Sequence, residues 1–243
     1  MDEKTLKSLI LPRHIGFIMD GNGRWATARG LERAQGHKAG AQTFRTISTY
    51  CAKLGIESVT FYAFSTENWK RPENEVNALM KLFREFLEEA QEREEENEEI
   101  GFHIKFAGDK ANMPEELVRL FEICEKRSAE KTGTTVNVAV NYGGRAEIAN
   151  AAREIARKAV RGELAAEDVD ENTVSSFLYT AGQPDPDLII RTGGESRLSN
   201  FLIWQSAYSE LYFTDILWPD FTTDDLDRAI IDFCSRNRRF GAV

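Results

Sequence analysis

Short apolar runs rich in Ile, Val and Phe alternate along the chain with longer segments whose apolar residues recur at helical spacing. This alternation is typical of βαβ units built around a mostly parallel sheet. The apolar runs predict strands at residues 14–19, 58–64, 102–107, 135–140 and 187–191, and a sixth strand at 210–213.

The segments between these runs have the spacing of amphipathic helices. Helices are predicted at residues 36–54, 73–98, 114–131, 145–161 and 224–236. A chain of 243 residues fits one α/β domain, because single cores stop growing near 250 to 300 residues. We therefore expect one domain over residues 1–243, with a flexible N-terminal segment at 1–13.

The overall charge narrows the choice of ligand. A formal net charge of −9 argues against a protein that binds the phosphate backbone of nucleic acids, since such domains usually carry a basic surface. An anionic ligand would therefore need a local basic pocket.

The cysteines and the apolar runs indicate the compartment. Three widely spaced cysteines without a CxxC pair favour reduced, cytoplasmic thiols over disulfides or a zinc site. The short apolar run near the N-terminus does not suit a secretion signal, and we expect no membrane-spanning helix. Any membrane contact is expected to be peripheral.

The most informative stretch follows the first predicted strand, where the run DGNGRW begins at Asp20. In open α/β sheets, ligands bind outside the carboxyl ends of the strands, and glycines there let backbone N–H groups approach a phosphate closely. Arg24 would add charge-assisted hydrogen bonds, and Asp20 would supply a carboxylate to a diphosphate-bound Mg²⁺. The motif alone fits a simple tight turn equally well, because Asp, Gly and Asn all favour turns.

Two further basic side chains, Arg33 and His37, stand four residues apart and therefore on one face of the next helical pattern. Both would then point back toward the same phosphate. Taken alone, a surface arginine and a capping or core histidine would be the ordinary interpretation.

Polar groups also follow the second and fifth predicted strands. Ser65, Asn68, Trp69 and Arg71 follow the second, in a segment that also suits an N-cap and turn before the next helix. After the fifth, RTGGESRLS places arginines and serines around a glycine pair, as a second anion site would require. Glu210 is a candidate for a second magnesium carboxylate.

With these residues the chain closely resembles the undecaprenyl diphosphate synthases, the bacterial cis-prenyltransferase or isoprenyl transferase family. The resemblance covers nearly the whole chain, and several blocks in the family's order are far more specific than any one of them. The blocks are HIGFIMDGNGRWA, GHKAG, YAFSTENWKRP, NYGGR, DLIIRTGGE, RLSNFLIWQ and ELYFTDILWPDF.

The resemblance implies a fold and a reaction. The fold is one α/β domain with a central, mostly parallel six-stranded sheet flanked by helices and enclosing a hydrophobic tunnel. The reaction is Mg²⁺-dependent transfer of an allylic group, from farnesyl diphosphate, onto successive isopentenyl diphosphate units. Its product is a long polyprenyl diphosphate, undecaprenyl diphosphate, the precursor of the lipid carrier in cell-wall peptidoglycan biogenesis.

The resemblance also implies a cytoplasmic homodimer that contacts the inner face of the membrane peripherally, for product release, and has no nucleic-acid partner. Leu79, Phe83, Phe86 and Leu87 suit a tunnel lining, and their helical spacing fits an ordinary core equally well.

The family's functional residues carry over onto matching positions. Asp20 and Asn68 are implied in catalysis, Asn68 as an aid in removing the proton, and Asp20 and Glu210 are implied in metal binding. The implied substrate-binding residues are Gly21, Asn22, Gly23, Arg24, Trp25, Arg33, His37, Ser65, Thr66, Glu67, Trp69, Arg71, Arg191, Arg197, Leu198 and Ser199. Gly21, Asn22, Gly23 and Arg24, assisted by Arg33 and His37, would hold the allylic diphosphate, and Trp25 and Trp69 match further substrate-binding positions. Arg71, Arg191, Arg197 and Ser199 would hold isopentenyl diphosphate.

Several alternatives stay open. Ser196 stands where members of the family often carry His, which leaves no imidazole at that position. A shorter-chain cis-prenyl diphosphate synthase would share these motifs, because product length depends on tunnel depth. A non-catalytic accessory subunit would have lost groups such as Asp20 and Asn68, which are present. A nucleotide-binding or phosphatase-like domain would show a GxxxxGK[ST] loop or a nucleophile with its base, and we find neither.

Overall fold

Six parallel strands form the centre of the molecule in the computed structural model, which describes residues 9–92 and 101–236. The strands are β1 His14–Ile18, β2 Ser58–Ser65, β3 His103–Ala107, β4 Thr135–Tyr142, β5 Leu188–Arg191 and β6 Glu210–Phe213. They lie in the order β3-β4-β2-β1-β5-β6, and each neighbouring pair is parallel. The six predicted strands are confirmed to within two residues at each end, and the sheet is wholly parallel.

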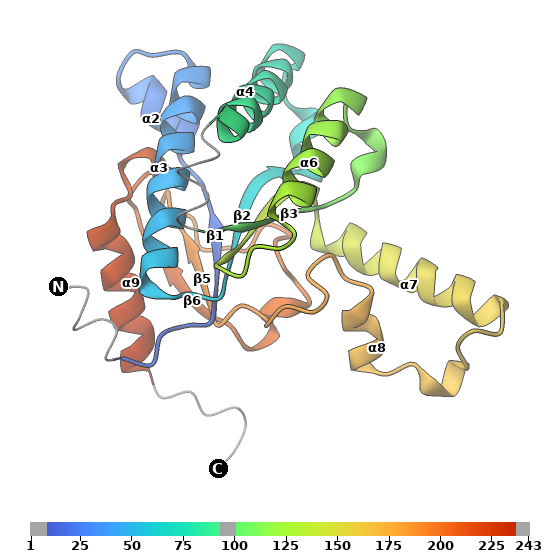
Figure 1. Cartoon of the computed structure of the whole chain (residues 1–243). Helices are drawn as coiled ribbons and strands as arrows, with labels where there is room; N and C mark the ends of the chain where they lie inside the picture. The colour runs from blue at the N-terminus through green and yellow to red at the C-terminus, as the bar shows by residue number, and fades with distance from the viewer. Residues whose placement is uncertain (1–8, 93–100, 237–243) are drawn as a thin grey trace.

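The helices connect the strands on both sides of the sheet (Figure 1). They are α2 Asn22–Ala28, α3 Arg33–Leu54, α4 Glu73–Glu92, α6 Glu115–Ser128, α7 Gly144–Val160, α8 Glu171–Ser176 and α9 Thr223–Ser235. The five predicted helices are confirmed, although the predicted end of the second, at 93–98, lies outside the described residues. The sequence did not predict α2 and α8, since helices of 7 and 6 residues are too short to show a periodic pattern.

One face of the sheet carries the largest part of the core. Phe17 of β1 and Phe61 of β2 stack with their ring centroids 4.8 Å apart, and Ile47 of α3 and Ile230 of α9 belong to the same buried cluster. Successive strand residues point to opposite faces of the sheet, and both faces are covered. This explains why the strands are continuous apolar runs. Helices α4 and α6 cover the rest of the face, through a second buried cluster.

The opposite face is covered mainly by irregular chain. Phe201 and Leu202 are fully buried there with Tyr142 of β4. Helices α7 and α8 extend from this part of the molecule to one side, away from α3 and α9 (Figure 1).

Close packing of α2 against α3 depends on small residues in α3. A Cβ atom at Gly40 would lie 2.3 Å from Asn22 Oδ1 and 2.9 Å from Trp218 Cδ1, so no larger residue fits. The α2 helix is thereby held against the first turns of α3, beside the carboxyl end of β1.

The strand order reverses direction at β1. The chain runs from β1 to β2 on one side, whereas β5, from far along the chain, pairs with the other side. A crevice at the carboxyl ends of the strands is expected at such a point. The ligand-binding region is therefore expected between the ends of β1 and β5.

The N-terminal segment predicted to be flexible, 1–13, lies partly outside the described residues. Within the described part, Arg13 Nε lies 2.8 Å from Glu57 Oε1, and the Arg13 backbone N–H donates to Asp187 Oδ2. Among the described helices, none is both long enough and apolar enough to cross a membrane.

Candidate active site

A small polar cavity lies at the carboxyl end of β1. Its walls come from the β1–α2 connection, the first turns of α3 and the segment before α4. The lining residues are Met19, Asp20, Gly21, Asn22, Gly23, Arg24, Arg33, His37 and Arg71. All residues implied in holding the allylic diphosphate are therefore brought together. Arg71, which was expected to hold isopentenyl diphosphate, lines the same cavity.

Glu75, a carboxylate that the sequence did not single out, contacts three of the basic side chains of this cavity. Glu75, in the first turn of α4, accepts a hydrogen bond of 2.9 Å from Arg71 Nη1 and lies 3.3 Å from Arg33 Nε and 3.9 Å from His37 Nε2. Only 13% of its side chain is exposed. The sequence contained little signal for this contact, because Arg71 precedes α4 in an extended conformation and does not share a helix face with Glu75.

Two residues that line this cavity carry unpaired buried polar atoms. Asn22 Oδ1 and His37 Nε2 are buried without a hydrogen-bond partner among the described residues. Burial is the main reason that the pKa of His37 falls to about 4, and the nearby Arg71 and Arg33 lower it further, against the opposing effect of Glu75. The imidazole is therefore neutral near pH 7. If Nε2 carries the proton, a bound anion would accept its hydrogen bond and satisfy a group that rarely stays unpaired in folded proteins.

Arg191, at the end of β5, connects this cavity to the next group of predicted residues. Its side chain is 4% exposed. Nη2 donates to Asp20 Oδ2 at 2.9 Å, and Nη1 donates to Ser199 Oγ at 2.7 Å and to the backbone carbonyl of Arg197. Arg191 Nε is buried without a partner among the described residues. Asp20 also lies 3.2 Å from Arg24 Nη2. Asp20, Arg24, Arg191 and Ser199 thus form one connected network of hydrogen bonds and ion pairs.

Arg197 and Leu198, which also belong to the predicted second anion site, lie at the edge of this network. The Arg197 guanidinium is largely exposed and donates to Glu195 Oε2 at 2.6 Å. Leu198 packs against the buried cluster on the far face of the sheet.

The segment after β2 forms a short 3-10 helix, η1 Thr66–Lys70. The Asn68 side chain folds back, and its Oδ1 accepts a hydrogen bond of 3.0 Å from the Ser65 backbone N–H. Trp69 Nε1 donates to Asn141 Oδ1 at 2.8 Å, and Thr66 donates to Glu67 Oε2 at 3.1 Å. These bonds fix the orientation of the amide and the indole, but within the described part of the chain none of these residues lines the polar cavity.

Two predicted site residues lie elsewhere. Trp25 Nε1 donates to Asp220 Oδ1 at 2.6 Å, and Arg29 stacks over the indole ring. Glu210 is the first residue of β6 and pairs in register with Leu188, which pairs with Ile15, so it lies near the amino edge of the sheet. Its carboxylate accepts a hydrogen bond of 2.7 Å from Arg236 Nη1.

This placement bears on the predicted metal site. Asp20 lies five residues beyond Ile15, which is level with Glu210, so the two are separated by roughly 16 Å along the strand at about 3.3 Å per residue. Ligand oxygens lie about 2.1 Å from Mg²⁺. Asp20 and Glu210 of one chain are therefore not brought together to share an ion.

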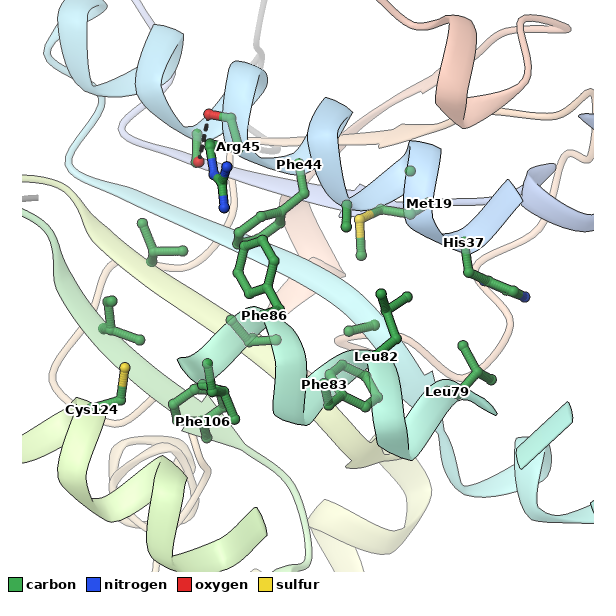
Figure 2. A pocket seen from close by; sticks show the side chains of 18 of the residues that line it. Met19, His37, Phe44, Arg45, Leu79, Leu82, Phe83, Phe86, Phe106 and Cys124 are labelled. Carbon is green, nitrogen blue, oxygen red and sulfur yellow. Dashed lines mark hydrogen bonds between the residues drawn. The ribbon is translucent and has the colours of Figure 1, made fainter. Parts of the chain in front are cut away.

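A larger apolar cavity opens beside the polar one, between α3, α4 and the sheet (Figure 2). Its volume is about 1380 Å³ with the open mouth included. The four α4 residues that suited a tunnel lining, Leu79, Phe83, Phe86 and Leu87, all line it. In Figure 2 the labelled side chains of α3 and α4 face each other across this space.

The two cavities share part of their walls. Met19, Asn22 and His37 line both, so the polar cavity and the apolar one are direct neighbours. On the flank, Arg45 Nη1 donates to Glu89 Oε1 at 3.3 Å while its guanidinium lies over the Phe86 ring. Cys124 and Phe106 line the cavity at the end away from His37 (Figure 2).

A cationic cavity directly beside an apolar one suits a ligand with an anionic head and a hydrocarbon tail. Its position at the carboxyl ends of β1 and β5, where the strand order reverses, is the usual binding site of an open α/β sheet. The fold and the site thus define an α/β protein that binds an anionic amphiphile.

The chain belongs to the undecaprenyl diphosphate synthase family: the family model described as putative undecaprenyl diphosphate synthase matches residues 18–241. An isoprenyl transferase from Clostridium perfringens is 48% identical, with 96% of this chain and 91% of the relative aligned. A ditrans,polycis-undecaprenyl-diphosphate synthase specific for (2E,6E)-farnesyl diphosphate, from Pseudomonas aeruginosa, is 46% identical over 98% of this chain and 94% of its own length. The resemblance seen in the sequence blocks is thereby confirmed.

Solved structures agree with this membership. Lavandulyl diphosphate synthase from Lavandula x intermedia, in complex with dimethylallyl diphosphate, superposes with a TM-score of 0.88 at 37% identity, covering 95% of this chain and 98% of that chain. A probable undecaprenyl diphosphate synthase from Campylobacter jejuni superposes with a TM-score of 0.77 at 31% identity and the same coverage.

Proposed function

We propose that this protein is a cis-prenyltransferase that joins isopentenyl diphosphate units, one after another, to an allylic diphosphate, farnesyl diphosphate, to make undecaprenyl diphosphate. The observation that carries the proposal is the shared wall of the two cavities at Met19, Asn22 and His37. A diphosphate head in the polar cavity would place its hydrocarbon tail directly in the apolar one. The relatives named for the same reaction support the same assignment.

The described side chains suit the first chemical step. As the allylic C–O bond breaks, negative charge develops on the departing diphosphate, and fixed cations stabilise it more than they stabilise the substrate. Arg24, Arg33 and Arg71 line the cavity where this charge would develop. The neutral His37 would donate a hydrogen bond from its buried Nε2 if that nitrogen carries the proton.

The second step forms the new carbon–carbon bond. The isopentenyl double bond attacks the allylic carbon, and one proton leaves the former isopentenyl unit. We propose that Arg191, Arg197 and Ser199 hold the isopentenyl diphosphate and that Asn68 assists the loss of the proton. The direct hydrogen bonds from Arg191 to Asp20 and Ser199 support this, because they join residues proposed for the two diphosphates.

Water must be kept from the electron-poor carbon. The apolar cavity serves this purpose, since a growing chain that fills it excludes solvent and gains about 0.8 kcal/mol for each buried methylene. Phe44, Phe83 and Phe86 form a large part of the wall that the chain would contact.

We propose Mg²⁺ as the cofactor. Mg²⁺ usually binds one or two carboxylates together with substrate phosphates and water. Asp20 fits this pattern, because its carboxylate lines the polar cavity and is 32% exposed. In the part of the chain that the structure describes, no three His, Cys, Asp or Glu side chains gather as a protein-only metal site would require. When bound, Mg²⁺ would neutralise charge on the departing diphosphate.

Product length is the finer part of the proposal. A shorter product is the second candidate, and the structural similarity to lavandulyl diphosphate synthase favours keeping it. The Pseudomonas aeruginosa relative named as an undecaprenyl-diphosphate synthase supports a long product.

We also propose a cytoplasmic homodimer that meets the membrane only peripherally. The free cysteines Cys51, Cys124 and Cys234 fit a reducing compartment, and β6 is an edge strand whose residues are all half-buried. A long apolar product needs an acceptor such as a lipid surface on release.

A non-catalytic accessory subunit would have lost the groups that bind the metal and the diphosphates. Asp20, Asn68 and Arg191 are all present, which supports catalysis instead.

The test is to incubate the purified protein with farnesyl diphosphate, labelled isopentenyl diphosphate and Mg²⁺, and to size the dephosphorylated products. Products near eleven isoprene units, lost in Asp20→Ala and without Mg²⁺, are expected. Shorter products would keep the reaction and change the product, whereas no incorporation would overturn the proposal.

A further inference from the structure

The chain segment after Arg197 adopts a backbone conformation that non-glycine residues seldom take. Ser199, Asn200 and Leu202 have φ values of 50°, 67° and 44°. Each such residue costs on the order of 1 kcal/mol and persists only where the surroundings hold it in place. Ser199, one of these residues, also accepts the hydrogen bond from Arg191.

Asn200 makes most of the contacts that hold this segment. Its backbone carbonyl accepts a hydrogen bond of 2.7 Å from the Gly144 N–H, and its Oδ1 accepts one of 2.9 Å from the Arg145 N–H, both at the start of α7. Its Nδ2 donates 3.0 Å to Glu67 Oε1 in η1. One side chain thus joins the segment to two other elements.

The close approach is built into the start of α7. A Cβ atom at Gly143 would lie 2.7 Å from Asn200 Nδ2 and 2.8 Å from Thr66 Oγ1. Any larger residue at Gly143 would therefore force apart the same pair of segments that the Asn200–Glu67 hydrogen bond connects.

The neighbours of this bond carry the proposed chemistry. Glu67 directly precedes Asn68, and Asn200 directly follows Ser199. The bond between them therefore fixes the position of Asn68 relative to Ser199. The family resemblance implied Glu67 in substrate binding but gave Asn200 no role.

We infer that Asn200 is a positioning residue, whose hydrogen bond to Glu67 sets the isopentenyl-binding side chains in register with the segment that carries Asn68. This inference rests on the proposed function. Only asparagine meets all the local demands, because it tolerates positive φ and offers both an acceptor for α7 and a donor for Glu67.

The Asn200→Asp variant keeps the acceptor for α7 and removes only the donor to Glu67. Asp also tolerates positive φ, and its carboxylate still accepts from the Arg145 N–H, but it can no longer donate to Glu67 and instead repels it. We expect KM for isopentenyl diphosphate to rise about tenfold or more, with KM for farnesyl diphosphate within about threefold of the parent. The Kd for isopentenyl diphosphate, measured by calorimetry, should rise with KM.

The double variant N200D/E67Q restores a donor–acceptor pair with reversed polarity, because the amide introduced by E67Q would donate to the new carboxylate. We expect it to recover both KM and Kd to within about threefold of E67Q alone. Asn150→Asp, which adds the same charge to α7, is the matched control and should change neither constant. The midpoint of thermal unfolding is measured for each variant.

The outcomes are separable. If the parent protein binds isopentenyl diphosphate but transfers no prenyl group, the proposed function fails, while the Kd series still tests Asn200. Unchanged KM and Kd in N200D, or no recovery in the double variant, would overturn the inference. A parent that does not bind isopentenyl diphosphate would overturn both.

Discussion

Arg191 Nη2 donates a hydrogen bond of 2.9 Å to Asp20 Oδ2, which joins the end of β5 to the end of β1. Arg191 is nearly fully buried, and its other terminal nitrogen holds Ser199. Asp20, proposed to bind the metal, and Ser199, proposed to bind isopentenyl diphosphate, therefore accept hydrogen bonds from the same guanidinium group. A substitution of Asp20 or of Ser199 should therefore shift the Arg191 side chain and alter the position of the other residue.

Asp20→Asn is expected to remove activity while leaving the fold intact. The amide cannot replace the charge that Mg²⁺ requires, and losing one electrostatic group at such a site typically lowers kcat by about 10²–10³-fold. Because Asp20 is only partly buried, the free energy of unfolding should fall by about 1–2 kcal/mol, less than for a fully buried pair. Single-turnover prenyl transfer and urea unfolding measure the two effects.

The matched control for Asp20 is Asp224→Asn, which removes the same charge from an exposed position in the first turn of α9. It should keep kcat within about twofold of the parent. Activity of Asp20→Asn within tenfold of the parent would contradict the role given to this carboxylate.

Glu75→Ala is expected to weaken binding of the allylic diphosphate. Without its carboxylate, Arg33 and Arg71 lose the shared partner that fixes their guanidinium groups, and they must be ordered again on binding. We expect KM for farnesyl diphosphate to rise about tenfold, equivalent to about 1.4 kcal/mol. Steady-state kinetics at saturating isopentenyl diphosphate measure the change.

Two variants bracket this result. Glu75→Gln keeps a hydrogen-bond acceptor for Arg71 and should lie between the parent and Glu75→Ala. Glu73→Gln changes an exposed residue of the same helical turn and should leave KM unaltered. A lower KM in Glu75→Ala would mean that this carboxylate competes with the substrate instead of positioning its partners.

Cys124→Phe is expected to shorten the product. The extra volume would fill the end of the apolar cavity away from His37, so the growing chain would stop earlier while the first condensation proceeds. The measurement is the length distribution of the dephosphorylated products, together with the rate of the first addition.

The adjacent residue gives a control for this substitution. Ile123 is 41% exposed on the same helix, so Ile123→Phe adds bulk toward solvent instead of the cavity. It should leave the length distribution unchanged. An unaltered distribution in a folded Cys124→Phe protein would show that the chain does not extend to this part of the cavity.

Two buried histidines should make the fold less stable in acid. Burial lowers the pKa of His14 and of His37 from 6.5 to about 4, so the unfolded chain binds protons that the folded protein excludes. Their contribution to stability is fully present above about pH 6.5 and is lost as the pH falls toward 4. For each, the full loss is on the order of 3 kcal/mol.

Urea unfolding between pH 4.5 and 7.5 measures this dependence. His14 Nδ1 lies 2.7 Å from the Pro184 carbonyl and Nε2 lies 2.8 Å from Thr60 Oγ1, so His14→Gln should lower stability at pH 7.5. It should also reduce the slope of stability against pH, because one titrating group is gone. Equal slopes in the parent and His14→Gln would refute the assignment of a buried, neutral imidazole.

The sequence by itself determined the strands, the long helices and much of the polar cavity. Alternation and helical spacing are local properties, so they placed Arg33 and His37 on one face and Asp20 and Arg24 after a strand end. Both expectations hold in the structure. The family blocks added Thr66, Glu67 and Leu198 and gave Asn68 its implied role in removing the proton, neither of which the strand-end pattern supplied.

The tertiary structure alone decided how distant segments meet. The meeting of Glu75 with Arg33, of Asn200 with Glu67, and of Arg191 with Asp20 depends on packing between elements far apart in the chain. It also placed Glu210 near the amino edge of the sheet, because strand register, which local pattern does not specify, sets the level of each residue. Composition and periodicity describe which face a residue occupies, but only the packed fold determines which side chains share a cavity.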